Sequence, residues 1–186
     1  YTFTGWAPTV ASTVTADATY VAQWSANEYT VRYEPGTQGT FAVQETTGLL
    51  YGVATPAAPA TPGNPGYTFT GWAPTVASTV TADATYVAQW SDNEYTVRYE
   101  PGDHGTFTAQ EDSGLLYGAD TPAAPETPGE TGWIFNGWSP EPAETVTADA
   151  TYVAQWRPEY YTVTYAPGEH GTFSPVVHSE LIYDSD

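Results

Sequence analysis

The sequence contains no cysteine, no methionine and no lysine, and it has only three arginines among its 186 residues. Without cysteine, the disulfides that usually stabilise small extracellular modules are excluded. Without lysine and cysteine, Lys–Asn isopeptide and Cys–Gln thioester cross-links are excluded as well. The stabilisation must therefore come from packing, and the 7 Trp, 15 Tyr and 6 Phe residues supply the material for an aromatic core.

Positive charge is also scarce. The 22 acidic residues leave a net charge of −19, which argues against binding of nucleic acid or of an anionic membrane surface, because both require basic patches. We expect the carboxylates to form a solvated surface and expect no cofactor. Calcium binding is the alternative, but no Asp-x-Asp-x-Asp-Gly loop identifies a site.

Long apolar runs are absent too. No run approaches the roughly 18–20 residues of a membrane-spanning helix, so direct membrane insertion of this segment is not expected. No signal peptide or anchor motif is present, and the chain opens on a strand-like segment. We therefore expect residues 1–186 to be part of a longer chain.

One stretch occurs three times. Residues 1–24 recur unchanged at 67–90 and, altered, at 133–156, and residues 1–66 and 67–132 differ at only 12 positions. Self-similarity at a fixed step of 66 residues indicates a tandem array of small modules. A unit of this size buries only about 60% of its chain surface, so we expect it to be marginally stable alone and to contact its neighbours.

The repeated segments alternate in the manner of half-buried strands. In 29–34, Tyr29, Val31 and Tyr33 point to one face, and we expect that face to be buried. In 1–6, Gly5 interrupts the alternation, and a bulge there would turn Phe3 and Trp6 to the same side. The expected structural core comprises Phe3, Trp6, Tyr20, Trp24, Tyr29, Val31, Tyr33, Phe69, Trp72, Tyr86, Trp90, Tyr95, Val97, Tyr99, Phe135, Trp138, Tyr152 and Trp156.

Further core contacts and a turn lie between these strands. Val10 and Val14 are spaced for contact with the core. Pro35, Gly36 and Gly39 indicate a turn, after which we expect a strand from Thr40 toward Glu45. The sequence thus predicts a mostly β protein with little or no helix.

The proline-rich stretch at 55–65 decides where a module begins. Its four prolines are incompatible with helix and with a central strand, so we expect an extended crossover. Read as a linker, it gives modules 1–66, 67–132 and 133–186. Kept inside the unit, it gives full repeats 29–90 and 95–156, with half-repeats 1–24 and 161–186.

No motif predicts catalysis. There is no Ser-His-Asp set, no Gly-x-Ser-x-Gly elbow and no phosphate-binding glycine loop, so we expect no enzyme and name no catalytic, cofactor-binding or metal-binding residue. His104 and His170 occupy equivalent turns where the first copy has Gln38, and we expect them to be exposed to solvent. Aromatics that face away from the core are the better ligand candidates, and by that criterion Tyr67 and Trp133 are the possible ligand contacts.

The motif order resembles a known family. Tyr-Thr-Val-x-Tyr-x-Pro-Gly-x-x-Gly, then Leu-x-Tyr-Gly, a proline-rich approach, Gly-Tyr-Thr-Phe-Thr-Gly-Trp and Thr-Tyr-Val-Ala-Gln-Trp resemble the Listeria–Bacteroides repeat, the B-repeat of internalin-type Gram-positive surface proteins. The resemblance covers 29–90 and 95–156 and both half-repeats. It implies β-grasp-like modules, the frame that keeps the crossover inside the unit, and an extracellular adhesin-type protein anchored to the cell wall outside this segment. The crossover helix that the family can carry is not expected here, because of the prolines.

Three functions remain open at this point. The first is a non-catalytic stalk in which the repeats act as an extended spacer that projects a binding domain. The second is a repeated module that binds a glycan or a host protein through exposed aromatics. The third is head-to-tail self-association, because the two half-repeats 1–24 and 161–186 are complementary and exposed strand edges favour pairing.

Overall fold

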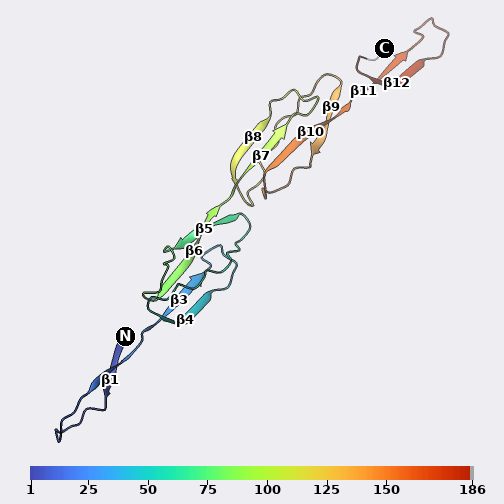
Figure 1. The fold of residues 1–186 in the computed structure, drawn as a ribbon. Coiled ribbons are helices and arrows are strands. Elements are labelled where there is room, and N and C mark those ends of the chain that lie inside the picture. The colour runs from blue at the N-terminus through green and yellow to red at the C-terminus, as the bar shows by residue number, and fades with distance from the viewer. Residues whose placement is uncertain (185–186) are drawn as a thin grey trace. The chain divides into compact units, whose positions relative to one another are not determined.

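The fold of residues 1–184, the part that the computed structural model describes, consists of strands with no helix (Figure 1). The predicted mostly β architecture is confirmed. The strands are β1 Thr2–Ala7, β2 Val21–Ser25, β3 Glu28–Glu34, β4 Gln44–Leu50, β5 Tyr67–Ala73, β6 Ala84–Asp92, β7 Glu94–Glu100, β8 Gln110–Leu116, β9 Trp133–Ser139, β10 Ala150–Pro158, β11 Tyr160–Tyr165 and β12 Val176–Ile182. They fall into two units, residues 1–91 and 92–186, which are described separately.

The first unit contains a four-stranded mixed sheet in the order β4-β3-β6-β5. At its centre β3 and β6 run parallel, with Val31 opposite Ala84 and Tyr33 opposite Tyr86. On the outer side β3 pairs with β4 in antiparallel fashion. Because β3 and β6 are parallel neighbours, the chain between them must cross over, and the proline-rich stretch is part of that connection.

The second unit repeats this sheet in the order β8-β7-β10-β9, again with a parallel central pair, β7 and β10. Its four strands begin 66 residues after their counterparts β4, β3, β6 and β5. The strands of one sheet therefore come from residues 28–92 and those of the other from 94–158. Each unit also carries a two-stranded hairpin, β1–β2 in the first and β11–β12 in the second.

The core of each sheet is the face that the alternation predicted. Val31, Tyr33, Val80 and Tyr86 are buried and form one cluster, against which Trp72 and other half-buried side chains pack. Val97, Tyr99, Val146 and Tyr152 form the equivalent cluster in the second sheet. Aromatic and β-branched side chains on one face of a pleated sheet bury a large apolar area, which stabilises these small modules without cross-links.

The predicted bulge at Gly5 is confirmed. The register between β1 and β2 shifts between Phe3 and Gly5, and the rings of Phe3 and Trp6 lie 5.5 Å apart on the same side. The equivalent Phe69 and Trp72 rings are also 5.5 Å apart. Gly5 has φ +143°, a conformation that favours glycine, so the bulge depends on this residue.

The prediction that Phe3, Trp6 and Trp24 are core residues is wrong for this copy of the repeat. Their side chains are exposed, and Val14 is 97% exposed although its counterpart Val80 is 2% exposed. Val10 is exposed as well, and Tyr20 is only half-buried. The reason is that β1 and β2 pair only with each other among the described residues, so no strand covers this face.

The strand expected from Thr40 begins later than predicted. Residues 40–43 are irregular, and β4 starts at Gln44 and continues through Leu50. Thr40 instead holds the crossover, because its backbone N–H donates to the carbonyl of Pro62 at 2.9 Å. Residues 55–65 contain neither helix nor strand, as the prolines predict, and further bonds attach the crossover to the sheet, including one from the Tyr33 hydroxyl to the Pro56 carbonyl at 2.8 Å.

Candidate functional surfaces

The central aromatic cluster of each module is packed ring against ring. The Tyr33 ring lies 4.9 Å from Trp72 in an edge-to-face contact and 5.3 Å from Tyr86. Burial raises the pKa of the Tyr33 phenol above its usual value, and the nearby Tyr86 adds to the shift. Tyr99 has the same surroundings and the same direction of pKa shift. These rings therefore serve packing.

Trp90 fastens the turn and the crossover to the sheet. Its Nε1–H donates to the Pro35 carbonyl at 2.8 Å, and its ring lies directly over Gly63, where any Cβ atom would overlap the ring. In the second module Trp156 donates to Pro101 at 2.7 Å and covers Gly129 in the same way. These indoles link three segments that are distant in sequence, so they are structural.

Trp133, one of the two predicted ligand contacts, is paired within its own module. The imidazole of His104 stacks on its indole with ring centroids 3.5 Å apart and planes at 10°. The Nδ1 atom of His104 is also 2.9 Å from Oε2 of Glu130. His104 is therefore half-buried, and the prediction of a solvent-exposed turn residue is wrong for it. His170 is exposed, as predicted.

The first module has a different pair of side chains at the position equivalent to His104 and Glu130. Asn64 Nδ2 donates to Gln38 Oε1 at 3.0 Å, and Tyr67, the other predicted ligand contact, is half-buried nearby in sequence. Gln38 and Asn64 correspond to His104 and Glu130 at the 66-residue step. Both members of the pair thus change together between the copies. That joint change was visible in the sequence and could have revealed the contact.

A cavity of about 310 Å³ lies beside the stacked pair in the second module. Its lining combines aromatic, acidic and amide side chains with backbone. The lining residues are Gly102, Asp103, His104, Trp133, Val153, Ala154, Gln155 and Trp156. One edge of Trp133 therefore faces a space in which a small polar ligand could reach it.

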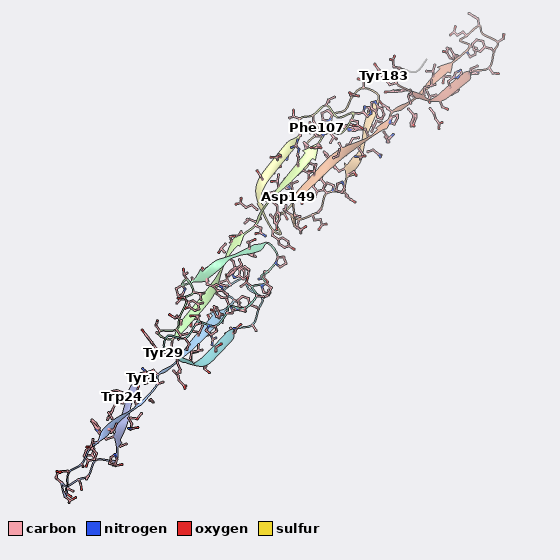
Figure 2. All side chains as sticks on the ribbon, viewed as in Figure 1. Tyr1, Trp24, Tyr29, Phe107, Asp149 and Tyr183 are labelled. Atoms are coloured by element: carbon pink, nitrogen blue, oxygen red, sulfur yellow. The ribbon has the colours of Figure 1, made fainter. Side chains whose placement is uncertain are left out.

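The regularly spaced aspartates hold loops to strands. Asp83 Oδ1 accepts a hydrogen bond from the backbone N–H of Thr30 at 2.8 Å, and Asp149 does the same for Thr96, also at 2.8 Å. Figure 2 shows Asp149 just before β10, beside β7. Sequence reasoning placed these aspartates in small turns but did not find the bonds, because they join residues 53 positions apart.

The Arg32 side chain of the first sheet is held by two carboxylates. Arg32 donates to Glu34 at 2.7 Å and to Glu45 at 3.0 Å, and both hydrogen bonds raise the pKa of its guanidinium. Among residues 1–184, no three of His, Asp and Glu gather closely enough to hold a metal ion. The outer face of this sheet therefore carries charged side chains that form ion pairs with one another.

Two apolar faces remain uncovered within the described part of the chain. The first, here called the head face, comprises Phe3, Trp6, Val14 and Trp24 and lies on and next to the β1–β2 hairpin, where Figure 2 shows Trp24. The second, the tail face, comprises Tyr161, Val163 and Tyr165 of β11. Their residues are 39% to 97% exposed.

Comparison with curated proteins shows similarity to a longer bacterial protein. The chain is 30% identical over 194 residues to a protein of Evansella cellulosilytica described as a "Putative membrane protein"; the match covers 92% of this chain and 29% of the relative. The chain thus spans less than a third of that protein. No family model matches, and no solved structure matches. Residues 1–184 contain no helix that could cross a membrane.

Proposed function

We propose that residues 1–186 are a non-catalytic spacer in a bacterial cell-surface protein of the adhesin type, in which repeated modules hold a binding domain away from the cell. The observation that carries this proposal is that the two sheets have the same strand order and the same buried aromatic cluster. The contacts that recur in both sheets serve packing, so additional copies add length.

Three further features support this role. The Listeria–Bacteroides repeat that the motifs resemble occurs in wall-anchored extracellular proteins, and a β-grasp-like description suits a mixed sheet with a parallel central pair. A net charge of −19 keeps long repeat arrays soluble. The relative is described as a "Putative membrane protein", which is compatible with attachment through a part outside this segment.

Small-angle scattering on chains with increasing numbers of repeats tests the proposal. A 66-residue globule is about 28 Å across by size scaling, so 186 residues would span on the order of 80 Å. A spacer requires the maximum dimension to increase by a constant amount with each added repeat. A maximum dimension that grows only with the cube root of the mass would reject the spacer role, because the modules would then collapse on one another.

The cavity beside Trp133 supports a second candidate, a module that binds a glycan or a host protein. An indole edge, the Asp103 carboxylate and the Gln155 amide border the same space, and such a combination suits a sugar hydroxyl array. A glycan array probed with the chain and with Trp133→Ala tests this role. Glycan signals that disappear in the variant support it, and an array without signals rejects glycan binding.

A further inference from the structure

The second unit contains a very short connection between repeats. The strand β10 ends at Pro158 and β11 begins at Tyr160, so only Glu159 lies between the four-stranded sheet and the hairpin β11–β12. The ring of Pro158 also fixes its own φ angle at about −65°. A short connection limits how far two parts of a chain can turn, but contacts across it decide whether they turn at all, since domains of one chain commonly move against each other.

The backbone of Glu159 is held by the sheet that precedes it. The ladder between β9 and β10 ends with Trp133 opposite Pro158. One residue beyond, the N–H of Glu159 donates to the carbonyl of Gly132 at 2.8 Å. The antiparallel pairing therefore continues into the connecting residue, so that Glu159 belongs to the sheet as much as to the connection.

The side chain of Glu159 is held by the hairpin that follows. The hydroxyl of Tyr161, the second residue of β11, donates to Oε2 of Glu159. This hydrogen bond is the main cause of the raised pKa of the Tyr161 phenol, and the nearby Tyr183 adds to the shift. Glu159 thus bridges the two parts, with its N–H bound on one side and its carboxylate on the other.

Gly132 and Tyr183 form a direct contact across the connection. Tyr183 follows Ile182, the last residue of β12, which pairs with Tyr160 at the start of β11 (Figure 2). A Cβ atom at Gly132 would overlap Cβ and Cγ of Tyr183. Gly132 is buried and has φ +84°, a conformation that favours glycine. The absence of a side chain at this position therefore leaves the room that Tyr183 occupies.

The first unit fastens the equivalent connecting residue in another way. Asn27 corresponds to Glu159 at two steps of 66 residues. Its Oδ1 atom accepts a hydrogen bond from the hydroxyl of Thr2, the first residue of β1, at 2.7 Å. In both units, then, the residue before the next repeat is bound to the strands that precede it.

We propose that Gly132, Glu159 and Tyr183 form a stiff joint between consecutive repeats, in which Gly132 is the socket for a tyrosine of the repeat that follows. The partner of this surface is therefore the next repeat of the same chain. The proposal rests on the proposed spacer function and specifies how a spacer keeps its reach, because a restricted joint prevents one repeat from folding back on the previous one.

Distances between two spin labels test the joint in the whole chain. The sequence has no cysteine, so Ala124→Cys and Ser174→Cys supply the only two labelling sites. Both positions are exposed; the first lies in the crossover before β9 and the second between β11 and β12. Double electron–electron resonance should give one narrow distance distribution. NMR relaxation of backbone amides should show a common tumbling time for β10 and β11.

Two side-chain variants remove the contacts of the joint one at a time. Tyr183→Ala removes the ring, and Glu159→Ala removes the carboxylate that Tyr161 binds. Tyr183 is 56% exposed, so the sheet does not need its ring in order to fold. Each variant should broaden the distance distribution, and the double variant should lose both the narrow distance and the common tumbling time. Tyr183→Phe keeps the ring over Gly132 and should behave as the wild type does.

Gly132→Ala tests the socket, and the chain offers a matched control. Gly118 has φ +79°, close to the value at Gly132, but a Cβ atom there would meet nothing within 4 Å. Both substitutions cost backbone strain of the same kind, and only Gly132→Ala also displaces Tyr183. We expect a shifted and broader distance in Gly132→Ala and the wild-type distance in Gly118→Ala.

Three results would overturn the proposal. A broad wild-type distribution, or separate tumbling of β10 and β11, would show that the joint is free. Wild-type distances in both Tyr183→Ala and Glu159→Ala would show that the short connection alone sets the orientation. Equal effects of Gly132→Ala and Gly118→Ala would assign the change to backbone strain. The spacer function fails separately, if the maximum dimension grows only with the cube root of the mass.

Discussion

The imidazole of His104 lies flat on the indole of Trp133, 3.5 Å away, and the same imidazole contacts the carboxylate of Glu130. This contact ties the turn after β7 to the start of β9, because His104 precedes the irregular segment before β8 and Trp133 is the first residue of β9. In the first module the amides of Gln38 and Asn64 make the corresponding tie. The two modules thus solve one packing requirement with different chemistry.

Replacement of His104 by alanine should destabilise the second module and leave the first unchanged. An aromatic pair of this kind contributes about 0.5–1.5 kcal/mol to the free energy of unfolding beyond simple burial. Hydrogen exchange can read both modules in one chain, so the first module is an internal control. Gln38→Ala is the matched variant in the first module. It should lower the free energy of unfolding by less, since no aromatic ring stacks on Gln38. An equal effect of the two variants would contradict a specific contribution from the stack.

Gly129→Ala should displace the Trp156 ring. A Cβ atom at Gly129 would overlap that ring, whose Nε1–H is held by the Pro101 carbonyl at 2.7 Å. Overpacking of this kind typically costs about 1–3 kcal/mol of stability. The measurement is urea unfolding followed by Trp fluorescence, with Ala124→Ser in the exposed part of the same crossover as control. Unchanged stability and an unchanged Trp156 spectrum would show that the crossover moves away without cost.

Asp149→Ala should loosen the start of β10 by removing the acceptor for the Thr96 N–H. Hydrogen bonds to charged groups contribute about 1.5–3 kcal/mol to the free energy of unfolding. Because the bond between Thr96 and Asp149 is exposed to solvent, we expect a loss of about 1 kcal/mol. The Thr96 amide should then exchange faster in an NMR experiment. Asp103→Ala, which removes an exposed carboxylate from the turn at the other end of β7, serves as control. Thr96 exchange that stays slow in Asp149→Ala would contradict the role of this bond.

Alkaline pH should destabilise both modules. Burial raises the pKa of the Tyr33 and Tyr99 phenols in the folded state above 10.0, so the folded chain keeps their protons longer than the unfolded chain does. The stabilisation from these two groups is complete below pH 10, where both states are protonated, and it decreases as the pH rises through the folded-state pKa. Ultraviolet titration of the phenolate band should show these tyrosines ionising last, together with Tyr161, whose hydrogen bond to Glu159 raises its pKa.

The variant Tyr33→Phe shows which part of the titration curve belongs to the Tyr33 phenol. The substitution removes one late-ionising phenol, so the high-pH part of the absorbance change should decrease. It also removes the hydrogen bond to the Pro56 carbonyl, so some stability is lost at every pH. Tyr51→Phe, at an exposed position, is the matched variant that leaves the buried phenols and the Pro56 hydrogen bond in place. Simultaneous ionisation of all tyrosines in the folded chain would contradict the burial argument.

The sequence was sufficient for features that depend on neighbouring residues. The alternation of Tyr29, Val31 and Tyr33 defined a strand and its buried face, and Gly5 marked a bulge, since both patterns are local. The prolines of 55–65 predicted an extended crossover for the same reason. Strand boundaries were less certain, and β4 starts at Gln44, because the segment before it is held by the crossover and not by a sheet partner.

Features that depend on distant segments could not be derived in this way. Asp83 and Thr30 are 53 positions apart, and no local pattern pairs them. Trp6 and Trp72 have identical surroundings in sequence but different burial, because burial is decided by β3, which only Trp72 contacts through Tyr33. The stack of His104 on Trp133 was missed because the turn histidine was interpreted without Glu130, which differs between the copies together with it. The frame of the repeat and the family resemblance stay predictions.

The parallel pairing of β3 with β6 has a consequence during synthesis. As the ribosome releases the chain, β3 and β4 are complete at Leu50, but their parallel neighbour begins only at Ala84. Formation of such long-range pairs is slow, since a long loop must close first. By the time β10 emerges, it offers the same Ala-Thr-Tyr-Val-Ala-Gln-Trp segment as β6. Nascent chains of this protein therefore risk joining the right strand from the wrong copy, and vectorial release from the ribosome, which presents β6 first, favours the correct partner.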